Sequence, residues 1–143
     1  MARNCSVAAT LELIGEQWSL LALREVFLGV RRFDAIADAT GAPRAVLVRR
    51  LRTLVETGIL ERVDYREPGA RTRQEYRLTP AGRELQPVLT ALMQWGDKHL
   101  AGPDGPPLAI THTECGEPVR ATLCCAAGHH LEDTGRELTA TPR

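Results

Sequence analysis

An arginine-crowded helix followed directly by a basic hairpin is the feature that most constrains the fold of this chain. Residues 43–60 read PRAVLVRRLRTLVETGIL, and nine consecutive positions hold four arginines: Arg44, Arg49, Arg50 and Arg52. Leu47, Leu51 and Leu54 recur at helical spacing, so one apolar stripe faces a core while the arginines project elsewhere. The preceding residues read as a shorter helix that ends in a tight turn at Gly41 and Pro43.

The residues after that helix alternate in polarity as a hairpin does. Residues 60–79, LERVDYREPGARTRQEYRLT, read as two short strands joined by a loop that holds Arg66, Arg71 and Arg73. A helix with exposed arginines beside an arginine-tipped hairpin is typical of a winged helix-turn-helix. Its second helix enters the major groove of DNA, and its loop lies along the backbone or the minor groove. The predicted fold class is therefore mainly α with a small β-hairpin, a winged helix-turn-helix with flanking dimerisation helices.

The charges of the chain are unevenly distributed, although its formal net charge is zero. Residues 43–83 hold ten arginines and five acidic residues, a net charge of +5 that the remainder of the chain balances. A cationic face of this kind is expected of a protein that binds the phosphate backbone. All the basic residues except Lys98 are arginines, which suits bidentate recognition of phosphate or guanine. A GC-rich genome explains the same preference, and we give that explanation more weight.

Further helices are expected on both sides of this unit. Apolar residues predict a short helix at residues 6–14 and another at 17–28, which is apolar nearly all round and therefore buried at the centre. Thr79 is expected to cap a long helix that begins at Pro80 and carries a broad apolar face. Such a face usually packs on a second copy of the chain. The predicted dimer interface consists of Leu85, Val88, Leu92 and Trp95.

The composition changes after residue 100, where AGPDGPP reads as a turn-rich linker. We therefore divide the chain into residues 1–101, a domain for DNA binding and dimerisation, and residues 102–143, a Cys/His-containing tail that is partly irregular or disordered. No apolar run approaches the roughly 20 residues of a membrane span, and the N-terminus does not resemble a secretory signal. We expect a cytoplasmic protein without membrane association, in which structural disulfides are improbable.

Two longer stretches resemble a known protein family. Residues 5–62, CSVAATLELIGEQWSLLALREVFLGVRRFDAIADATGAPRAVLVRRLRTLVETGILER, and residues 76–100, YRLTPAGRELQPVLTALMQWGDKHL, are similar to HxlR-type regulators, a branch of the bacterial MarR-like winged-helix transcription factors. The resemblance covers about residues 4–101. It implies a homodimer on double-stranded operator DNA, whose occupancy changes with an electrophile, an oxidant or a small-molecule effector. Because several such regulators use the matching N-terminal cysteine, it also implies that Cys5 is a redox sensor.

Helical geometry places one set of residues opposite the leucine stripe, and we predict that this set lies in the major groove: Arg44, Ala45, Val48, Arg49 and Arg52. Two of them are apolar and suit contact with the methyl group of thymine. Arg71 and Arg73 in the loop are predicted to contact phosphate. Arg50 lies nearer the stripe and is expected to form an ion pair with Glu25 or Asp34. The alternative is a solvated basic face on a winged helix that assembles with an acidic protein.

Two interpretations of Cys5 stay open. Most free cysteines behave as small buried hydrophobic residues. The N-terminus of a helix can instead lower the pKa of a thiol through its partial positive charge and free amides. On that second interpretation Cys5 reacts with oxidants faster than the cysteines of the tail. If Cys5 only packs, the signal enters elsewhere, as a ligand bound near Trp18 and Trp95.

The tail contains six side chains of the types that bind zinc: His112, Cys115, Cys124, Cys125, His129 and His130. The CxxCG knuckle that the family resemblance implies here is broken, because Ala127 stands where a second cysteine would follow Cys124. We therefore expect no metal cofactor, with a metal-sensing regulator as the alternative. The sequence shows no catalytic triad, phosphate-binding loop or paired carboxylates with a positioned histidine, so we do not expect an enzyme.

Overall fold

The computed structural model describes residues 5–141 of the chain. Contacts divide the chain into two compact units, one up to Leu89 and one from Thr90, so that the boundary falls inside helix α6 (Gln86–His99). The division predicted at residue 101 follows a change in composition instead. No helix in the described part of the chain is long and apolar enough to cross a membrane.

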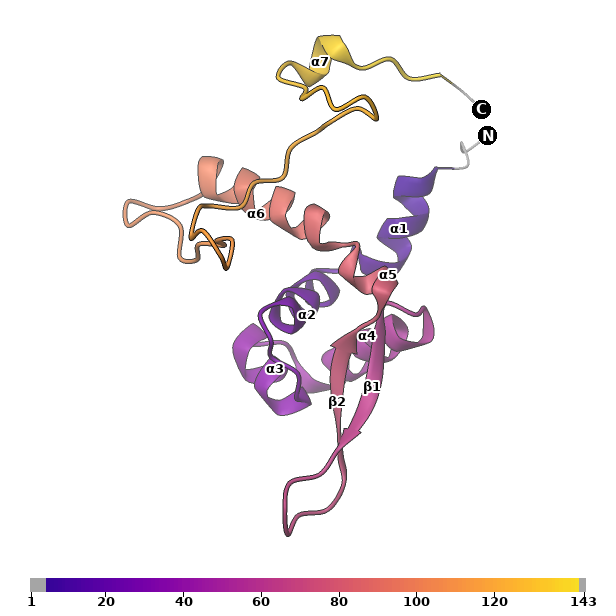
Figure 1. Ribbon diagram of the computed structural model, residues 1–143. Helices are drawn as coiled ribbons and strands as arrows, with labels where there is room; N and C mark the ends of the chain where they lie inside the picture. Colours follow the sequence, from indigo (N-terminus) through magenta and orange to yellow (C-terminus); the bar gives the residue numbers. More distant parts are fainter. Residues whose placement is uncertain (1–4, 142–143) are drawn as a thin grey trace. The chain divides into compact units, whose positions relative to one another are not determined.

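The first unit is organised around α2 (Gln17–Phe27), which contacts three further helices and is seen among them in Figure 1. These helices are α1 (Ser6–Ile14), α3 (Phe33–Thr40) and α4 (Arg44–Glu56). The side chain of Leu23 on α2 is fully buried, as expected for the central helix. The leucine stripe of α4 is also fully buried, at Leu47, Leu51 and Leu54. The opposite side of α4 therefore projects away from the core.

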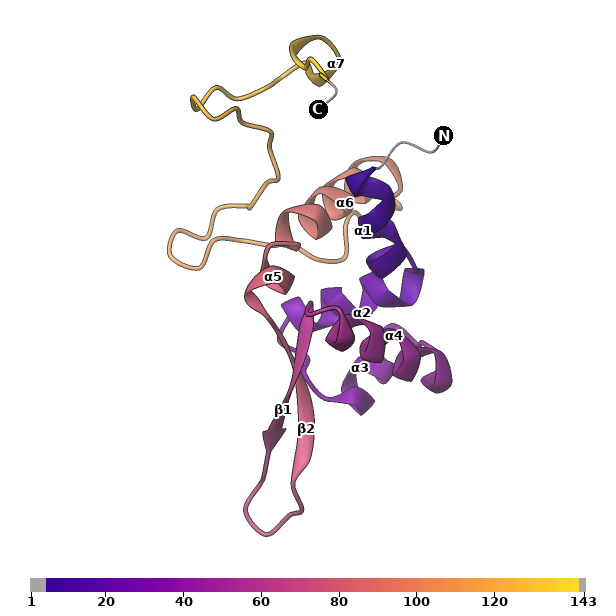
Figure 2. The ribbon, with the colours of Figure 1, turned by 90° about the vertical axis from the view of Figure 1, so that its right-hand side faces the viewer.

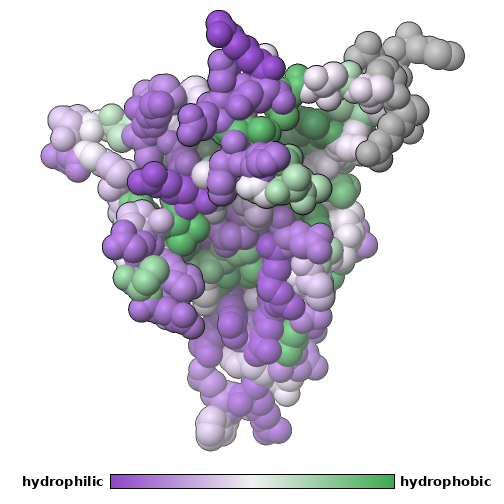
Figure 3. Space-filling model, turned by 45° about the horizontal axis from the view of Figure 1, so that its top comes forward, coloured by the Kyte–Doolittle hydropathy of each residue, from purple (hydrophilic) through white to green (hydrophobic). Residues whose placement is uncertain are grey.

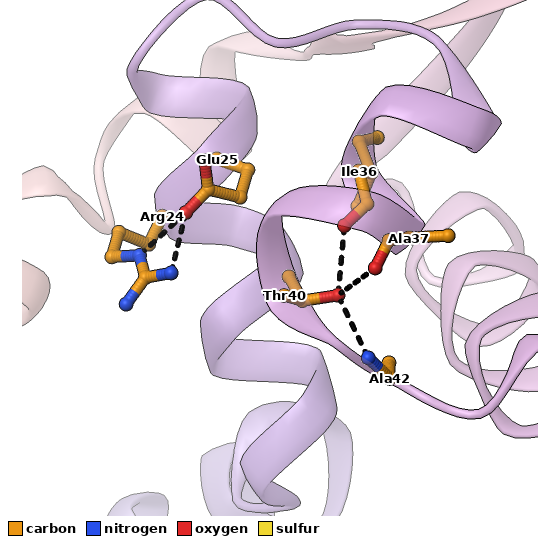
Figure 4. Close-up of polar contacts among 6 residues, drawn as sticks. All are labelled: Arg24, Glu25, Ile36, Ala37, Thr40 and Ala42. Atoms are coloured by element: carbon orange, nitrogen blue, oxygen red, sulfur yellow. Dashed lines mark hydrogen bonds and ion pairs between the residues drawn. The ribbon is translucent and has the colours of Figure 1, made fainter.

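The turn between α3 and α4 is held by the side chain of Thr40, as Figure 4 shows. Its hydroxyl donates to the carbonyl oxygen of Ile36 at 2.7 Å and accepts the backbone N–H of Ala42 at 3.2 Å. Gly41 ends α3 with a φ of 70°, a left-handed conformation that glycine adopts at little cost because it has no Cβ. The predicted turn is confirmed, and Pro43 takes the position immediately before α4.

The predicted hairpin is formed by β1 (Leu60–Tyr65) and β2 (Arg73–Leu78), which pair antiparallel so that the first residue of β1 lies opposite the last residue of β2. Leu60 is buried and Leu78 packs against the core, so the base of the hairpin is anchored. Its far end projects beyond the helices, as Figure 2 shows. This is the predicted mainly α fold with a small hairpin, a winged helix.

The single long helix expected after Thr79 is two helices, α5 (Pro80–Arg83) and α6. Thr79 caps the first one as predicted, since its hydroxyl accepts the backbone N–H of Gly82 at 3.0 Å. The expectation of a continuous helix is wrong because of Pro87, whose ring crowds the carbonyl four residues earlier and which has no N–H to donate. Gly82 leaves no space for a side chain, which would collide with the carbonyl oxygen of Ile59.

The second unit contains most of α6, an irregular segment and the short helix α7 (Thr134–Glu137). Two tight turns in the irregular segment are closed by isolated bridges, one between Thr111 and Pro118 and one between Cys124 and His130. Nearly all the described side chains after residue 100 are exposed. The tail thus consists of local turns with most of its side chains in solvent.

Candidate nucleic-acid interface

One face of α4 presents every residue that we predicted to lie in the major groove. These residues are all exposed, whereas the leucine stripe on the other side of the helix is buried: Arg44, Ala45, Val48, Arg49 and Arg52. Because α4 packs on α2 and β1, the buried stripe fixes the direction in which this face points within the unit. Exposed side chains on a rigid helix are what reading base edges in a groove requires.

The arginines on this face differ in how they are held. The Nη2 atom of Arg44 lies 2.6 Å from Oδ1 of Asp34, and its guanidinium lies 4.9 Å from the centroid of the Phe33 ring. Both partners belong to α3, so Arg44 is oriented across the turn between the two helices. The side chains of Arg49 and Arg52 form no hydrogen bond or ion pair with other residues in the described range 5–141. Their guanidinium groups are available to a ligand.

Arg50 forms an ion pair, but the partners that we predicted for it are wrong. Its Nη2 atom lies 3.3 Å from Oε2 of Glu16, immediately before α2. Glu25 pairs instead with Arg24, at 2.5 Å from its Nη2 atom (Figure 4), and Asp34 pairs with the first arginine of α4. The reason is packing: α4 contacts α1 as well as α2, so Arg50 meets the junction between those helices.

The hairpin supplies a second basic surface, whose lower end is dominated by hydrophilic residues in Figure 3. Arg71 in the loop and Arg73 at the start of β2, the predicted phosphate contacts, are both exposed. Arg66 is tied to the loop itself, because its Nε donates to the carbonyl oxygen of Ala70 at 2.9 Å. The two predicted phosphate contacts thus lie at or beside the projecting end of the hairpin, where a wing meets a backbone.

Arg32 holds the hairpin to α3, a role that the sequence analysis missed. Its Nη2 atom lies 2.6 Å from Oε1 of Glu67, and its guanidinium lies 4.4 Å from the centroid of the Tyr65 ring. The hydrogen bond to Glu67 raises the pKa of Arg32 above its ordinary value. A backbone link lies next to it, where the N–H of Tyr76 donates to the carbonyl oxygen of Arg31 at 2.7 Å. The sequence shows two arginines before α3, but no signal points to a partner 35 residues away.

The predicted dimer face is exposed at three of its four residues. The exposed fractions of Val88, Leu92 and Trp95 are 43%, 54% and 59%. Leu85 is different, because it is partly buried and packs against the core. The prediction of Leu85 in the dimer interface rests on the expectation that it has no partner within its own chain, and that expectation is wrong. Helix α1 adds an exposed apolar residue, Val7, at 66%.

All four cysteines of the chain are free and exposed. Cys5 directly precedes α1, as predicted, and its carbonyl oxygen accepts the N–H of Ala9 at 3.0 Å. It is not buried within this chain. A lowered thiol pKa is found at Cys125 in the tail, where the backbone N–H groups of His129 and Ala127 stabilise the thiolate. The sequence analysis did not single out this thiol.

The tail brings together two of its six residues of metal-binding type. The Nδ1 atom of His112 lies 3.3 Å from Sγ of Cys115 across the first turn. Within residues 5–141, no group of three or more His, Cys, Asp or Glu side chains lies close enough to hold a metal ion.

Comparisons with known proteins place the chain among proteins of related sequence and fold. The HxlR-like helix-turn-helix family matches residues 13–103. Rv3095 of Mycobacterium tuberculosis, an uncharacterised HTH-type transcriptional regulator, is 48% identical over 138 residues, which are 96% of this chain and 85% of that protein.

Two solved structures differ in how much of the chain they resemble. The structure of PA1607, a proposed transcription factor, is 33% identical with a TM-score of 0.82, over 98% of this chain and 97% of that one. The redox regulator HypR in its reduced form is 26% identical with a TM-score of 0.57, over 66% of this chain and 92% of that one. The likeness to PA1607 thus extends through the tail.

Proposed function

Because this chain belongs to the HxlR-like helix-turn-helix family, we propose that it is a homodimeric repressor that binds double-stranded operator DNA in the cytoplasm. The chain is a transcriptional regulator of the helix-turn-helix type and not an enzyme. In the proposal, residues 1–101 bind DNA and dimerise, and operator binding responds to a reactive electrophile, an oxidant or a hydrophobic small ligand.

The observation that carries the DNA-binding part is the exposed face of α4 beside the hairpin. Arg49 and Arg52 offer bidentate donors that suit guanine, and Val48 offers methyl groups that suit thymine. Arg71 and Arg73 on the hairpin supply cations for phosphate. One compact unit thus carries groups suited to both kinds of contact that a specific DNA-binding protein makes.

Binding to duplex DNA over a range of salt concentrations tests this part. We expect the logarithm of the binding constant to fall linearly with the logarithm of salt concentration on random duplex DNA. Tighter binding is expected on the operator, for which DNase footprinting of the region upstream of the protein's own gene is the first search. A winged helix that assembles with an acidic protein would bind neither DNA, and that outcome would refute the proposal.

The homodimer is proposed from the apolar residues that α6 leaves in solvent. Leu92→Asp should yield a monomer in light scattering and lose operator binding, because one half-site lacks the added affinity of two. Leu100→Asp is the matched control, since Leu100 is 72% exposed but lies outside the predicted face. A Leu92→Asp variant that remains dimeric would place the interface elsewhere.

The response to oxidants is proposed from the exposure of Cys5 and from the likeness to HypR, whose structure is known in reduced and oxidised forms. The test is a gel-shift titration with diamide, which oxidises two thiols, in this proposal Cys5 of each subunit, to a disulfide and takes up their two hydrogens. Cys5→Ser should keep DNA binding and lose the release by diamide, whereas Cys125→Ser should behave as the parent. If Cys5→Ser still releases DNA with diamide and Cys125→Ser does not, the sensor is Cys125 in the tail.

A further inference from the structure

A cavity of about 410 Å³, half open to solvent, lies at the base of the hairpin within the unit up to Leu89. Its walls come from the end of α2, the adjoining ends of β1 and β2, and α5. Val26 and Phe27 supply an apolar wall, and three arginines line it from separate elements: Arg31, Arg77 and Arg83. The volume falls within the roughly 300–1,000 Å³ that is usual for small-molecule sites.

The three arginines are only partly neutralised. Arg31 and Arg77 share one oxygen of Glu75, which lies 3.9 Å from Nη1 of Arg31 and 2.5 Å from Nη2 of Arg77. Among the described residues, the side chain of Arg83 donates only to a backbone carbonyl, that of Leu78, at 3.1 Å. Even with Glu61, which also lines the cavity, the group keeps one net positive charge. Each guanidinium has five N–H donors, so most of these donors remain for a ligand.

We propose that this cavity binds a small organic anion, a carboxylate on a compact apolar body. A carboxylate matches the planar fork of a guanidinium and can accept two parallel hydrogen bonds from it. The apolar body would lie against Phe27, Val26 and Leu78, which supply the hydrophobic part of the lining. A fully hydrated inorganic anion would use the arginines but not this apolar wall.

The cavity is placed to act on the hairpin. The residue that lines it before α3, Arg31, also accepts the backbone N–H of Tyr76 on β2 at 2.7 Å. An anion that draws Arg31 and Arg77 away from Glu75 therefore changes side-chain contacts of β2 near the base of the hairpin. The regulatory consequence, a change in the position of the wing on DNA, rests on the proposed function, whereas the binding itself does not.

Isothermal titration of the DNA-free protein with benzoate and hexanoate tests the binding. We expect Arg83→Ala to weaken both by roughly tenfold or more, because a charge-assisted hydrogen bond is lost. Arg66→Ala is the matched control, since Arg66 is also exposed and also donates to a backbone carbonyl, but lies outside the cavity. Benzamide, the neutral isostere of benzoic acid, should not bind measurably. Equal affinity of parent and Arg83→Ala, or no binding of either carboxylate, would overturn the proposal. Phosphate binding as tightly as benzoate would refute its apolar part.

A gel shift with benzoate then distinguishes the proposed anion site from its proposed effect on DNA binding. If benzoate binds with the expected dependence on Arg83 and shifts operator affinity in the parent but not in Arg83→Ala, both the site and the effect are supported. If the DNA-free protein shows that binding but never binds DNA, the site stands and the proposed function fails. If DNA binding is normal and neither carboxylate binds, only the cavity proposal fails.

Discussion

Helix α4 and the hairpin are both rich in arginine, yet their arginines have different support. Those of α4 stand on a helix whose opposite side is buried through three leucines. Those of the hairpin stand on a loop and on strands that project beyond the helices, as Figure 2 shows. At the base, β1 contacts α4, but towards the tip the hairpin is held to α3 by the contacts of Arg32 with Tyr65 and Glu67.

This difference indicates that the arginines of α4 suit base reading and those of the hairpin suit phosphate contact, although their number alone does not distinguish the two roles. Reading a base edge requires a donor held at a fixed depth and angle, which a packed helix provides. A phosphate contact tolerates movement, because the charge of the backbone repeats along the duplex and carries no sequence information directly. Residues with the same side chain are thus expected to behave differently when they are replaced.

The largest expected effect comes from truncating a buried leucine on the side of α4 opposite its exposed face, here called the reading face (Arg44, Ala45, Val48, Arg49 and Arg52). Leu51→Ala should lower the free energy of unfolding by about 2–5 kcal/mol, because a fully buried leucine leaves a cavity when it is truncated. Urea denaturation measures this change. Val48→Ala on the exposed face of the same helix is the control and should change stability by less than about 0.5 kcal/mol. Similar losses for the two variants would show that the faces are not distinguished as described.

The next effect concerns specificity. Arg49→Ala should weaken operator binding by roughly 1–3 kcal/mol and relax the preference at one base position. Fluorescence anisotropy on operators with single base changes measures both quantities. If the loss is the same on operator and on random DNA, Arg49 contacts phosphate, and the reading face lies elsewhere.

The sequence was sufficient for the parts of this interface that depend on local chemistry. The spacing of Leu47, Leu51 and Leu54 predicts which side of α4 is buried, because a helix repeats about every 3.6 residues. The conformational freedom of Gly41 predicts the turn. The interruption before Pro87 was readable from the same kind of local rule, which our expectation of one long helix overlooked.

Contacts between distant residues were not predictable in this way. The predicted partners of Arg50 were wrong, and the ion pair that joins Arg32 to the hairpin was not predicted. Both ion pairs depend on how separate elements pack. From the sequence alone, several acidic residues are equally good partners for an arginine. The cavity beneath Arg83 has the same origin, because its walls come from segments that only the fold brings together.

A smaller effect is expected at the loop of the hairpin. Arg71→Ala should weaken binding to all sequences equally and reduce the slope of log affinity against log salt by about 0.9, the value for one lost phosphate contact. Arg66→Ala should change the slope less, because Arg66 is already engaged by the carbonyl oxygen of Ala70. A change in base preference for Arg71→Ala would remove the distinction between helix and hairpin.

The smallest effect should come from the hold of α3 on the hairpin. Arg32→Ala removes both the ion pair with Glu67 and the contact with the ring of Tyr65, and should reduce DNA affinity by less than about tenfold, since exposed pairs are weak. The informative measurement is a double-mutant cycle between Arg32→Ala and Arg71→Ala. If Arg32 positions the wing, the two losses are not additive, because Arg71 on a loosely held hairpin has less contact left to lose. Glu67→Gln, which keeps the ring contact but removes the charge, should fall between the parent and Arg32→Ala. Strict additivity would mean that the contacts of Arg32 do not position the hairpin on DNA, and that only the contacts at the base of the hairpin do so.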